Sequence, residues 1–318
     1  MSESRGPLLE VLRTPEARFA NLPGYGFAPH YLEVAGPQGT RLRMHYLDEG
    51  PRAAPVVLLL HGEPTWSYLY RKLIPVLVAA GLRAVAPDHI GFGRSDKLVT
   101  RTDYTFERHR DWLRTLVRAL DLVNIVVVCQ DWGGPIGLGV LAGEPERFAA
   151  VVAANTILPT VEPELTAGVL EWRSDLLLDW ILTSQRLAEF PAGGIVAGVC
   201  KSALTPAVIA AYDAPFPDES YKAGVRQFPV LIPLTPADPG AAINRATWAV
   251  LARFERPFVT AFSDSDPATA GWQTIFQRGV PGAQGQPHVT IADAGHFLQE
   301  DAGEALAEVI VALARRLG

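Results

Sequence analysis

The sequence is poor in cysteine, and Cys129 and Cys200 are the only two among 318 residues. Two thiols in a chain of this length do not make a disulfide framework, and no C-x-x-C pair is present for metal or redox chemistry. These absences exclude a disulfide-stabilised secreted scaffold and a cysteine-based metal centre. We therefore expect a cytoplasmic protein without a bound metal.

Long apolar runs and a large excess of one charge are also missing. The longest apolar stretches, such as residues 55–60, are far shorter than the ~20 residues that a membrane helix needs. Residues 1–7 lack the apolar core of a secretory signal. The formal net charge is −6, which gives no electrostatic footprint for nucleic acid. We expect neither a membrane nor a nucleic acid as a partner.

Apolar residues, in contrast, make up 48% of the chain, which is enough for a large core. Short unbroken apolar runs alternate with helical stretches such as 106–120 and 303–317, a pattern typical of parallel strands buried on both faces. It predicts an α/β fold with a mostly parallel central sheet and helices on both faces. The expected strands are His30–Val34, Arg41–Leu47, Val56–Leu60, Arg83–Ala86, Ile125–Cys129, Ala150–Ala153, Phe258–Phe262 and His288–Ile291.

The strand pattern stops after Asn155 and resumes near Phe258. Between these points, residues 158–231 are helical in character and rich in proline. A helical block between two strands of one sheet can cover the carboxyl ends of the strands, where ligands bind in open α/β sheets. We therefore predict a core made of residues 1–156 and 232–318, with an inserted helical cap of residues 157–231.

Asp131 occupies the position at which a hydrolase usually carries a serine. Residues 124–134 combine a short apolar strand, a sharp turn and the small residues that open a helix, which is the layout of the nucleophile elbow G-x-S-x-G. A single aspartate in such a turn is more often a helix N-cap. As a nucleophile, however, a carboxylate can displace a leaving group from saturated carbon and remain attached as an ester.

Two residues follow Asp131 in the order nucleophile, acid, histidine that α/β-hydrolases share. Asp266 comes just past the strand at 258–262, and His296 comes past the strand at 288–291. Each of them alone would fit a turn or a solvated loop. Their joint occurrence, each after its own strand, predicts a catalytic set.

The identity of the acid has one close alternative. Asp264 competes with Asp266, but the spacing from the small residue Ser263 favours Asp266. The other acid position, after the preceding strand, holds Asn155 and offers no carboxylate. His288 is the second histidine after the acid; it lies in a strand pattern, and we expect it to be structural.

The segment His61-Gly-Glu-Pro-Thr-Trp66 directly follows the strand at 56–60. It resembles the oxyanion loop of α/β-hydrolases, whose backbone N–H groups meet negative charge developing on a carbonyl oxygen. We expect the donors to be the backbone N–H groups of Glu63 and Trp132. A simple turn is the alternative interpretation of this segment.

Together these features resemble the haloalkane dehalogenases, in particular the α/β-hydrolase subfamily with an Asp-His-Asp triad and two halide-binding tryptophans. The resemblance covers most of the chain and rests on the combination of its segments. One departure is Cys129, which stands where the elbow pattern has glycine; a less tight turn tolerates it. The segments are His61-Gly-Glu-Pro-Thr-Trp-Ser-Tyr-Leu-Tyr-Arg71, Gln130-Asp-Trp-Gly-Gly134 and Ala214-Pro-Phe-Pro-Asp218.

The resemblance implies both a reaction and its ligands. Asp131 would attack a carbon of a small halogenated alkane and form an alkyl ester. His296, oriented by Asp266, would then activate water to hydrolyse that ester. The products are an alcohol, a halide ion and a proton, and no metal or organic cofactor is involved.

A departing halide needs hydrogen-bond donors without a cation that would compete for the nucleophile, and indole N–H groups meet that need. Trp132, next to Asp131, is expected to be one donor. The second should come from the cap. Its position relative to residues 214–218 favours Trp180 over Trp172.

Other functions share parts of this pattern. An epoxide hydrolase has the same aspartate nucleophile and would use cap tyrosines, here Tyr212 and Tyr221, to protonate the epoxide oxygen. A fluoroacetate dehalogenase typically has an arginine at the position of Trp132. A non-catalytic α/β-hydrolase that only binds a small ligand is a further alternative, against which the intact triad argues. We expect a monomer.

Overall fold

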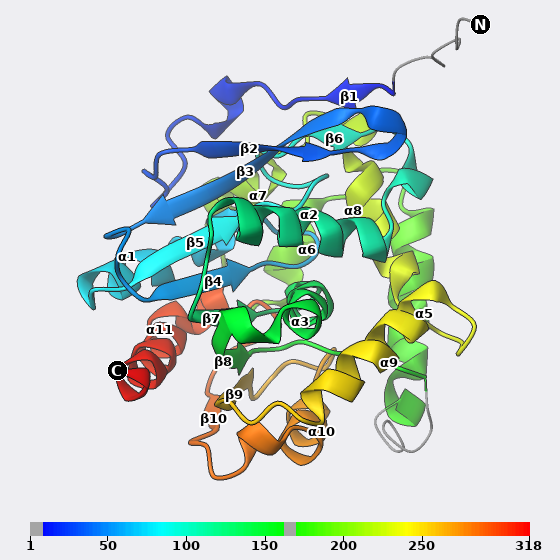
Figure 1. Cartoon of the computed structure of the whole chain (residues 1–318). Helices are drawn as coiled ribbons and strands as arrows, with labels where there is room; N and C mark the ends of the chain where they lie inside the picture. The colour runs from blue at the N-terminus through cyan, green and yellow to red at the C-terminus, as the bar shows by residue number, and fades with distance from the viewer. Residues whose placement is uncertain (1–8, 162–169) are drawn as a thin grey trace, which may run out of the picture.

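A computed structural model of the chain describes residues 9–161 and 170–318. An eight-stranded sheet forms its centre, in the order β10-β9-β8-β7-β4-β5-β3-β2 (Figure 1). Strand β3 is antiparallel to both of its neighbours, and the other pairs are parallel. The prediction of a mostly parallel α/β sheet is confirmed. The strands are β2 (His30–Ala35), β3 (Arg41–Glu49), β4 (Val56–Leu60), β5 (Arg83–Pro87), β7 (Ile125–Cys129), β8 (Phe148–Ala153), β9 (Phe258–Ser263) and β10 (Val289–Ile291).

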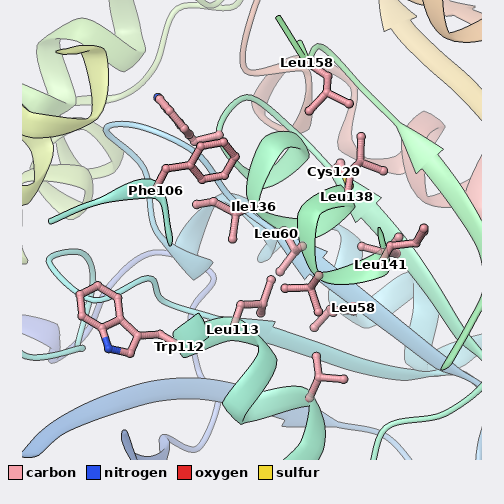
Figure 2. Packing of buried hydrophobic residues seen from close by; sticks show 14 of the residues in the cluster. Leu58, Leu60, Phe106, Trp112, Leu113, Cys129, Ile136, Leu138, Leu141 and Leu158 are labelled. Atoms are coloured by element: carbon pink, nitrogen blue, oxygen red, sulfur yellow. The ribbon is translucent and has the colours of Figure 1, made fainter. Parts of the chain in front are cut away.

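The central strands are apolar throughout because both faces of the sheet are covered. In β4, Leu58 and Leu60 belong to one buried cluster, and Val57 and Leu59 belong to another on the opposite face. This alternation follows from the two-residue period of a strand. Figure 2 shows Leu58 and Leu60 packed among side chains of the first cluster. A short antiparallel pair, β1 (Val11–Leu12) and β6 (Lys97–Leu98), lies outside the sheet.

Six helices of the described ranges pack around this sheet. Helix α2 packs on α3, and α3 on α9, while α1 packs on α11. Helix α2 begins after Thr105, whose hydroxyl accepts a hydrogen bond from the backbone N–H of Arg108 at 3.2 Å, a normal N-cap. The six are α1 (Leu73–Ala79), α2 (Phe106–Ala119), α3 (Gly133–Gly143), α9 (Pro239–Leu251), α10 (Trp272–Gly279) and α11 (Leu298–Leu317).

The last helix is longer than the sequence pattern predicts. It begins at Leu298 rather than at Gly303, with a local departure from helical backbone at Ala302. A Cβ atom on Gly303 would lie 3.0 Å from the Cβ of Lys72. Gly303 therefore allows close packing of α11 on α1 instead of marking the start of the helix.

The chain between β8 and β9 supplies a set of helices at one end of the sheet: α5 (Leu170–Arg186), α6 (Ala192–Val199), α7 (Pro206–Asp213) and α8 (Ala223–Gln227). In Figure 1 they lie toward the side to which the arrows of β4 and β5 point. We refer to residues 157–231 as the insertion, and these boundaries stay a prediction. No helix in the described ranges is both long and apolar enough to cross a membrane.

A buried ion pair connects the insertion to the core. Arg71, before α1, donates to both carboxylate oxygens of Glu300 in α11, with Nη2 2.8 Å from Oε2. The hydroxyl of Tyr212, in α7, donates to the same carboxylate. A second link runs from Trp66 Nε1 to the carbonyl oxygen of Ala211, 3.1 Å away. Because these groups are buried, water cannot substitute for the partners, and α7 is held firmly on the core.

Candidate active site

Five loops meet at the carboxyl edge of the sheet. They follow β4, β7, β8, β9 and β10, which are consecutive neighbours in parallel pairing. Parallel neighbours end on the same side of a sheet, so side chains that follow each strand converge there. These loops carry Glu63, Asp131, Asn155, Asp266 and His296.

The backbone at Asp131 adopts the left-handed conformation, with φ of 49°. A non-glycine residue rarely takes this conformation, and it persists only where the surroundings enforce it. The N–H of Asp131 donates to the carbonyl oxygen of Asn155 at 2.9 Å, and its carbonyl oxygen accepts from the N–H of Gly134 at 3.0 Å and the hydroxyl of Thr156 at 2.6 Å. These bonds hold the sharp turn that the sequence predicts. Cys129 is the last residue of β7, so its position does not require glycine.

The carboxylate of Asp131 has two different oxygen environments. Oδ1 accepts the backbone N–H of Glu63 at 2.7 Å. Oδ2 lies 3.5 Å from Nε2 of His296. A Cβ atom on Gly62 would lie 2.0 Å from Oδ1, so only glycine lets the loop approach this closely. The N–H of Trp132, at the start of α3, belongs to the first groups of a helix, which have no partner within it.

The side chain of Glu63 is buried beside this carboxylate. Burial and the negative charge of Asp131 raise the pKa of Glu63 well above its ordinary value. Oε1 of Glu63 has no hydrogen-bond partner in the described part of the chain. Both causes favour the neutral form of Glu63 next to the Asp131 carboxylate.

His296 is joined to Asp266 on its other side. Nδ1 of His296 lies 3.0 Å from Oδ2 of Asp266, which also accepts the hydroxyl of Thr269. Burial disfavours the charged imidazole, but the charges and hydrogen bonds of Asp266 and Asp131 outweigh it and raise the pKa of His296 to about 10. Burial opposes the charge of Asp266 as well, yet the pKa of Asp266 is lowered because His296 and Thr269 stabilise its carboxylate.

The two candidate acids have different surroundings. Asp264 is exposed and accepts the backbone N–H groups of Asp293 at 3.0 Å and Ala294 at 3.3 Å. It thus shapes the loop before His296 but does not touch the imidazole. His288 contacts the backbone N–H of Thr260 and lies outside this site. The structure brings Asp266, and not Asp264, to His296.

Two amides also contact the histidine, and sequence reasoning had given neither of them a role. The amide nitrogen of Gln130 lies 3.2 Å from His296 Nε2 and 3.3 Å from its carbonyl oxygen. The amide nitrogen of Asn155 donates to the carbonyl oxygens of Gly295 at 2.9 Å and His296 at 3.0 Å. The position of Asn155 after β8 is the sequence feature that could have indicated this role. An amide at this position does not match the carboxylate expected of a catalytic acid.

Trp132 is fixed by aromatic neighbours. Its ring stacks on Phe228 at a centroid distance of 5.0 Å and an interplanar angle of 12°, and the ring of Phe106 meets its edge at 5.6 Å. Figure 2 shows Phe106 in this buried cluster. In residues 9–161 and 170–318, no acceptor takes a hydrogen bond from Nε1 of Trp132. Within that part of the chain, the indole N–H is therefore not committed to a protein acceptor.

A small cavity of about 20 Å³ adjoins Asp131 and Trp132. This volume suits a guest of roughly one water molecule. Trp180 is half-buried in α5 and meets Phe190 edge-on at 6.2 Å; it does not line this cavity. The side chain of Trp172 lies outside the described residues. The cavity is lined by Asp131, Trp132, Pro135, Ile157, Pro159, Ile232, Pro233 and Asn244.

The two tyrosines that an epoxide hydrolase would need are not equally available. The hydroxyl of Tyr212 is buried and donates to Glu300, so it is already used in linking the insertion to the core. Tyr221 is half-buried and packs against the apolar core. Tyr212 therefore does not offer its hydroxyl to a substrate, as the epoxide hydrolase alternative would require.

A parallel sheet with a left-handed nucleophile turn, an acid and a histidine at its carboxyl edge defines an α/β-hydrolase. The family model for the alpha/beta hydrolase fold matches residues 55–189. A haloalkane dehalogenase of Psychrobacter cryohalolentis is 54% identical over 95% of this chain and 97% of its own. A haloalkane dehalogenase of Mycobacterium marinum is 48% identical over 95% of this chain and 99% of its own. The chain belongs to the haloalkane dehalogenase family.

A solved structure agrees with this assignment. The haloalkane dehalogenase of Paraglaciecola agarilytica NO2, described as tetrameric, superposes with a TM-score of 0.86 at 38% identity. The match covers 95% of this chain and 97% of that one.

The choice between Asp266 and Asp264 leads to a direct test. In Asp266→Asn, His296 loses its main charge partner and keeps its burial, so its pKa should fall from about 10 by roughly one to three pH units. Asp264→Asn, the matched control, should leave that pKa unchanged. NMR titration of the imidazole resonances measures both. A fall in Asp264→Asn alone would assign the partner role to Asp264.

Proposed function

We propose that this protein hydrolyses the carbon–halogen bond of small halogenated alkanes, with Asp131 as the nucleophile. One observation carries the proposal: the Asp131 carboxylate stands in the elbow with Oδ1 bound by the Glu63 N–H and Oδ2 facing His296. The close similarity to haloalkane dehalogenases supports the choice of electrophile.

The first step forms an ester on the enzyme. Oδ2 of Asp131 attacks the carbon that carries chlorine, bromine or iodine, and the carbon–halogen bond breaks as the carbon–oxygen bond forms. The electron pair of the broken bond leaves with the halide. The indole N–H of Trp132, next to the nucleophile, donates to that ion, and Trp180 is proposed as the second donor.

Ester formation changes the charge around His296. In the resting site, Asp131 is one of the two groups that raise the pKa of His296. An ester carries no negative charge, so its formation removes that cause and leaves burial opposed by Asp266 alone. The pKa of His296 then falls and the imidazolium releases its proton to solvent. The first step thus generates the base that the second step requires.

Water hydrolyses the ester in the second step. Nε2 of His296 takes a proton from water, and the resulting hydroxide attacks the ester carbonyl carbon. The N–H of Glu63, which already binds Oδ1, and the N–H of Trp132 stabilise the oxyanion. Asp266 stabilises the histidine cation. Collapse of the intermediate breaks the bond between the carbonyl carbon and the alkoxy oxygen. The proton of the added hydroxyl passes to the alkoxide, which releases the alcohol and restores the Asp131 carboxylate.

Two alternative functions are less well supported. An epoxide hydrolase would lack the hydroxyl of Tyr212, which Glu300 holds. A protein that only binds a ligand would have no need for a buried acid within 3.0 Å of a histidine that faces a carboxylate. We also propose that the protein is a cytoplasmic monomer. The two free cysteines support the cytoplasmic location.

Turnover of a substrate panel tests the reaction. Purified protein should release halide from 1-chloro-, 1-bromo- and 1-iodoalkanes and give the matching alcohol in equal amount. Styrene oxide, run alongside, should stay intact. Halide and alcohol are measured by ion and gas chromatography. Formation of a diol from styrene oxide without halide release from the panel would reassign the protein as an epoxide hydrolase.

The covalent intermediate can be trapped. In His296→Phe, alkylation of Asp131 proceeds but no base activates water, so 1,2-dibromoethane should leave an alkyl ester on Asp131. Intact mass spectrometry and peptide mapping detect it. Asp131→Ala in the same background is the control and should remain unmodified. An unmodified Asp131 in His296→Phe after halide release would refute the mechanism.

Replacing each tryptophan separately tests the halide donors. A hydrogen bond to a charged group is worth about 1.5–3 kcal/mol, so loss of one donor should slow alkylation on the order of 10- to 100-fold. We expect this for Trp132→Phe and Trp180→Phe, measured by the rapid-quench halide burst. Trp172→Phe is the matched control and should change the rate less than about threefold. The opposite result for Trp172 and Trp180 would make Trp172 the second donor.

A further inference from the structure

The insertion contacts the loop that carries His296 directly, backbone to backbone. The N–H of His296 donates to the carbonyl oxygen of Val199, the last residue of α6, at 3.0 Å. A Cβ atom on Gly295 would lie 2.2 Å from that same oxygen. The histidine loop and the end of α6 are therefore as close as two backbones can pack.

Asp301, in the first turn of α11, joins the two segments a second time. Oδ2 of Asp301 accepts the N–H of Gly295 at 2.8 Å and the N–H of Lys201 at 2.9 Å. Oδ1 accepts the N–H of Ser202 at 2.7 Å. One carboxylate thus binds the residue before His296 and the two residues after Cys200. Hydrogen bonds to an ionised acceptor are about twice as strong as neutral ones.

The core binds the opposite side of the same loop. Asn155 donates to the carbonyl oxygens of Gly295 and His296, and the hydroxyl of Ser263 donates to Gly295 at 2.9 Å. The core therefore binds the carbonyl groups of Gly295 and His296, whereas Asp301 and Val199 bind the N–H groups of the same two residues. Without the hydrogen bonds to Val199 and Asp301, the peptide around His296 keeps its bonds to Asn155 and Ser263 but can tilt about them.

The nucleophile does not depend on this contact. Asp131 is held by Glu63, Asn155, Gly134 and Thr156, all of them in the core loops. A change at Asp301 thus reaches the base and leaves the nucleophile in place. In the proposed reaction, alkylation uses Asp131, and ester hydrolysis also needs His296.

We propose that Asp301 is a positioning residue that couples the insertion to the general base. It keeps His296 within reach of the water that attacks the ester, and it does so only while residues 199–202 are seated against the loop. The proposal rests on the role of His296 given under the proposed function. It assigns to the insertion an effect on the second half of the reaction, separate from the halide donor that it supplies to the first half.

The test separates the two half-reactions in Asp301→Ala. With 1,2-dibromoethane in a rapid-quench experiment, the halide burst should keep its rate within about twofold. The following hydrolysis should slow on the order of 10- to 100-fold, as displacement of a catalytic group by about 1 Å does. The alkyl-enzyme should then accumulate, and mass spectrometry should detect it at steady state. A purely structural loss would lower both rates together.

Two more variants complete the experiment. Asp301→Asn keeps one acceptor oxygen and should slow hydrolysis less than Asp301→Ala; if the alanine variant does not fold, the asparagine variant decides. Asp238→Ala is the matched control, because Asp238 accepts the backbone N–H groups of Leu234 and Thr235 at 2.8 and 2.7 Å away from the histidine loop. It should leave the ratio of the two rates unchanged.

The outcomes distinguish this proposal from the proposed function. If both rates fall together in the Asp301 variants, or hydrolysis keeps its wild-type rate, the coupling is wrong. If His296→Phe traps the ester on Asp131 in the same experiments, the mechanism stands in either case. Absence of that ester would instead overturn the proposed function itself.

Discussion

The buried imidazole of His296 lies between two carboxylates, and the surrounding loops are arranged around that charge pattern. Burial alone would keep the imidazole neutral, but Asp266 and Asp131 hold it as a cation in the resting site. Each carboxylate also accepts a hydrogen bond that stabilises its negative charge. Glu63 supplies an N–H to Asp131, and Thr269 a hydroxyl to Asp266. These two hydrogen bonds determine where the loops after β4 and β9 lie relative to the carboxylates.

Short-range patterns predict most of the fold and the principal members of the site. The repeated short runs of apolar residues predict the sheet, and the turn after β7 predicts the position of Asp131. The order of Asp131, Asp266 and His296 follows from this topology, because parallel strands bring their carboxyl ends to one edge. These features depend on residues close together in the sequence, which is why one sequence suffices.

Features that depend on long-range packing were not accessible in this way. Tyr212 resembles a substrate-facing cap tyrosine in the sequence, but the side chain turns to Glu300, 88 positions away. Asn155 offers no carboxylate, and its role appears only when the histidine loop is beside it. The sequence pattern predicts that the last helix begins at Gly303, whereas in the structure Gly303 allows α11 to pack closely on α1. The environment of Trp180 depends on how α5 lies on the core, which local periodicity does not specify.

The position of Asp131 in the wall of the small cavity has a consequence for the release of the product ion. In the resting site, its carboxylate and that of Asp266 lie on either side of the His296 imidazole. In the proposed reaction, alkylation removes the negative charge of Asp131 as the new halide forms. Once hydrolysis restores the Asp131 carboxylate, the halide shares a small cavity with an anion. In the proposed reaction, the completed cycle therefore favours the release of its own ionic product through electrostatic repulsion.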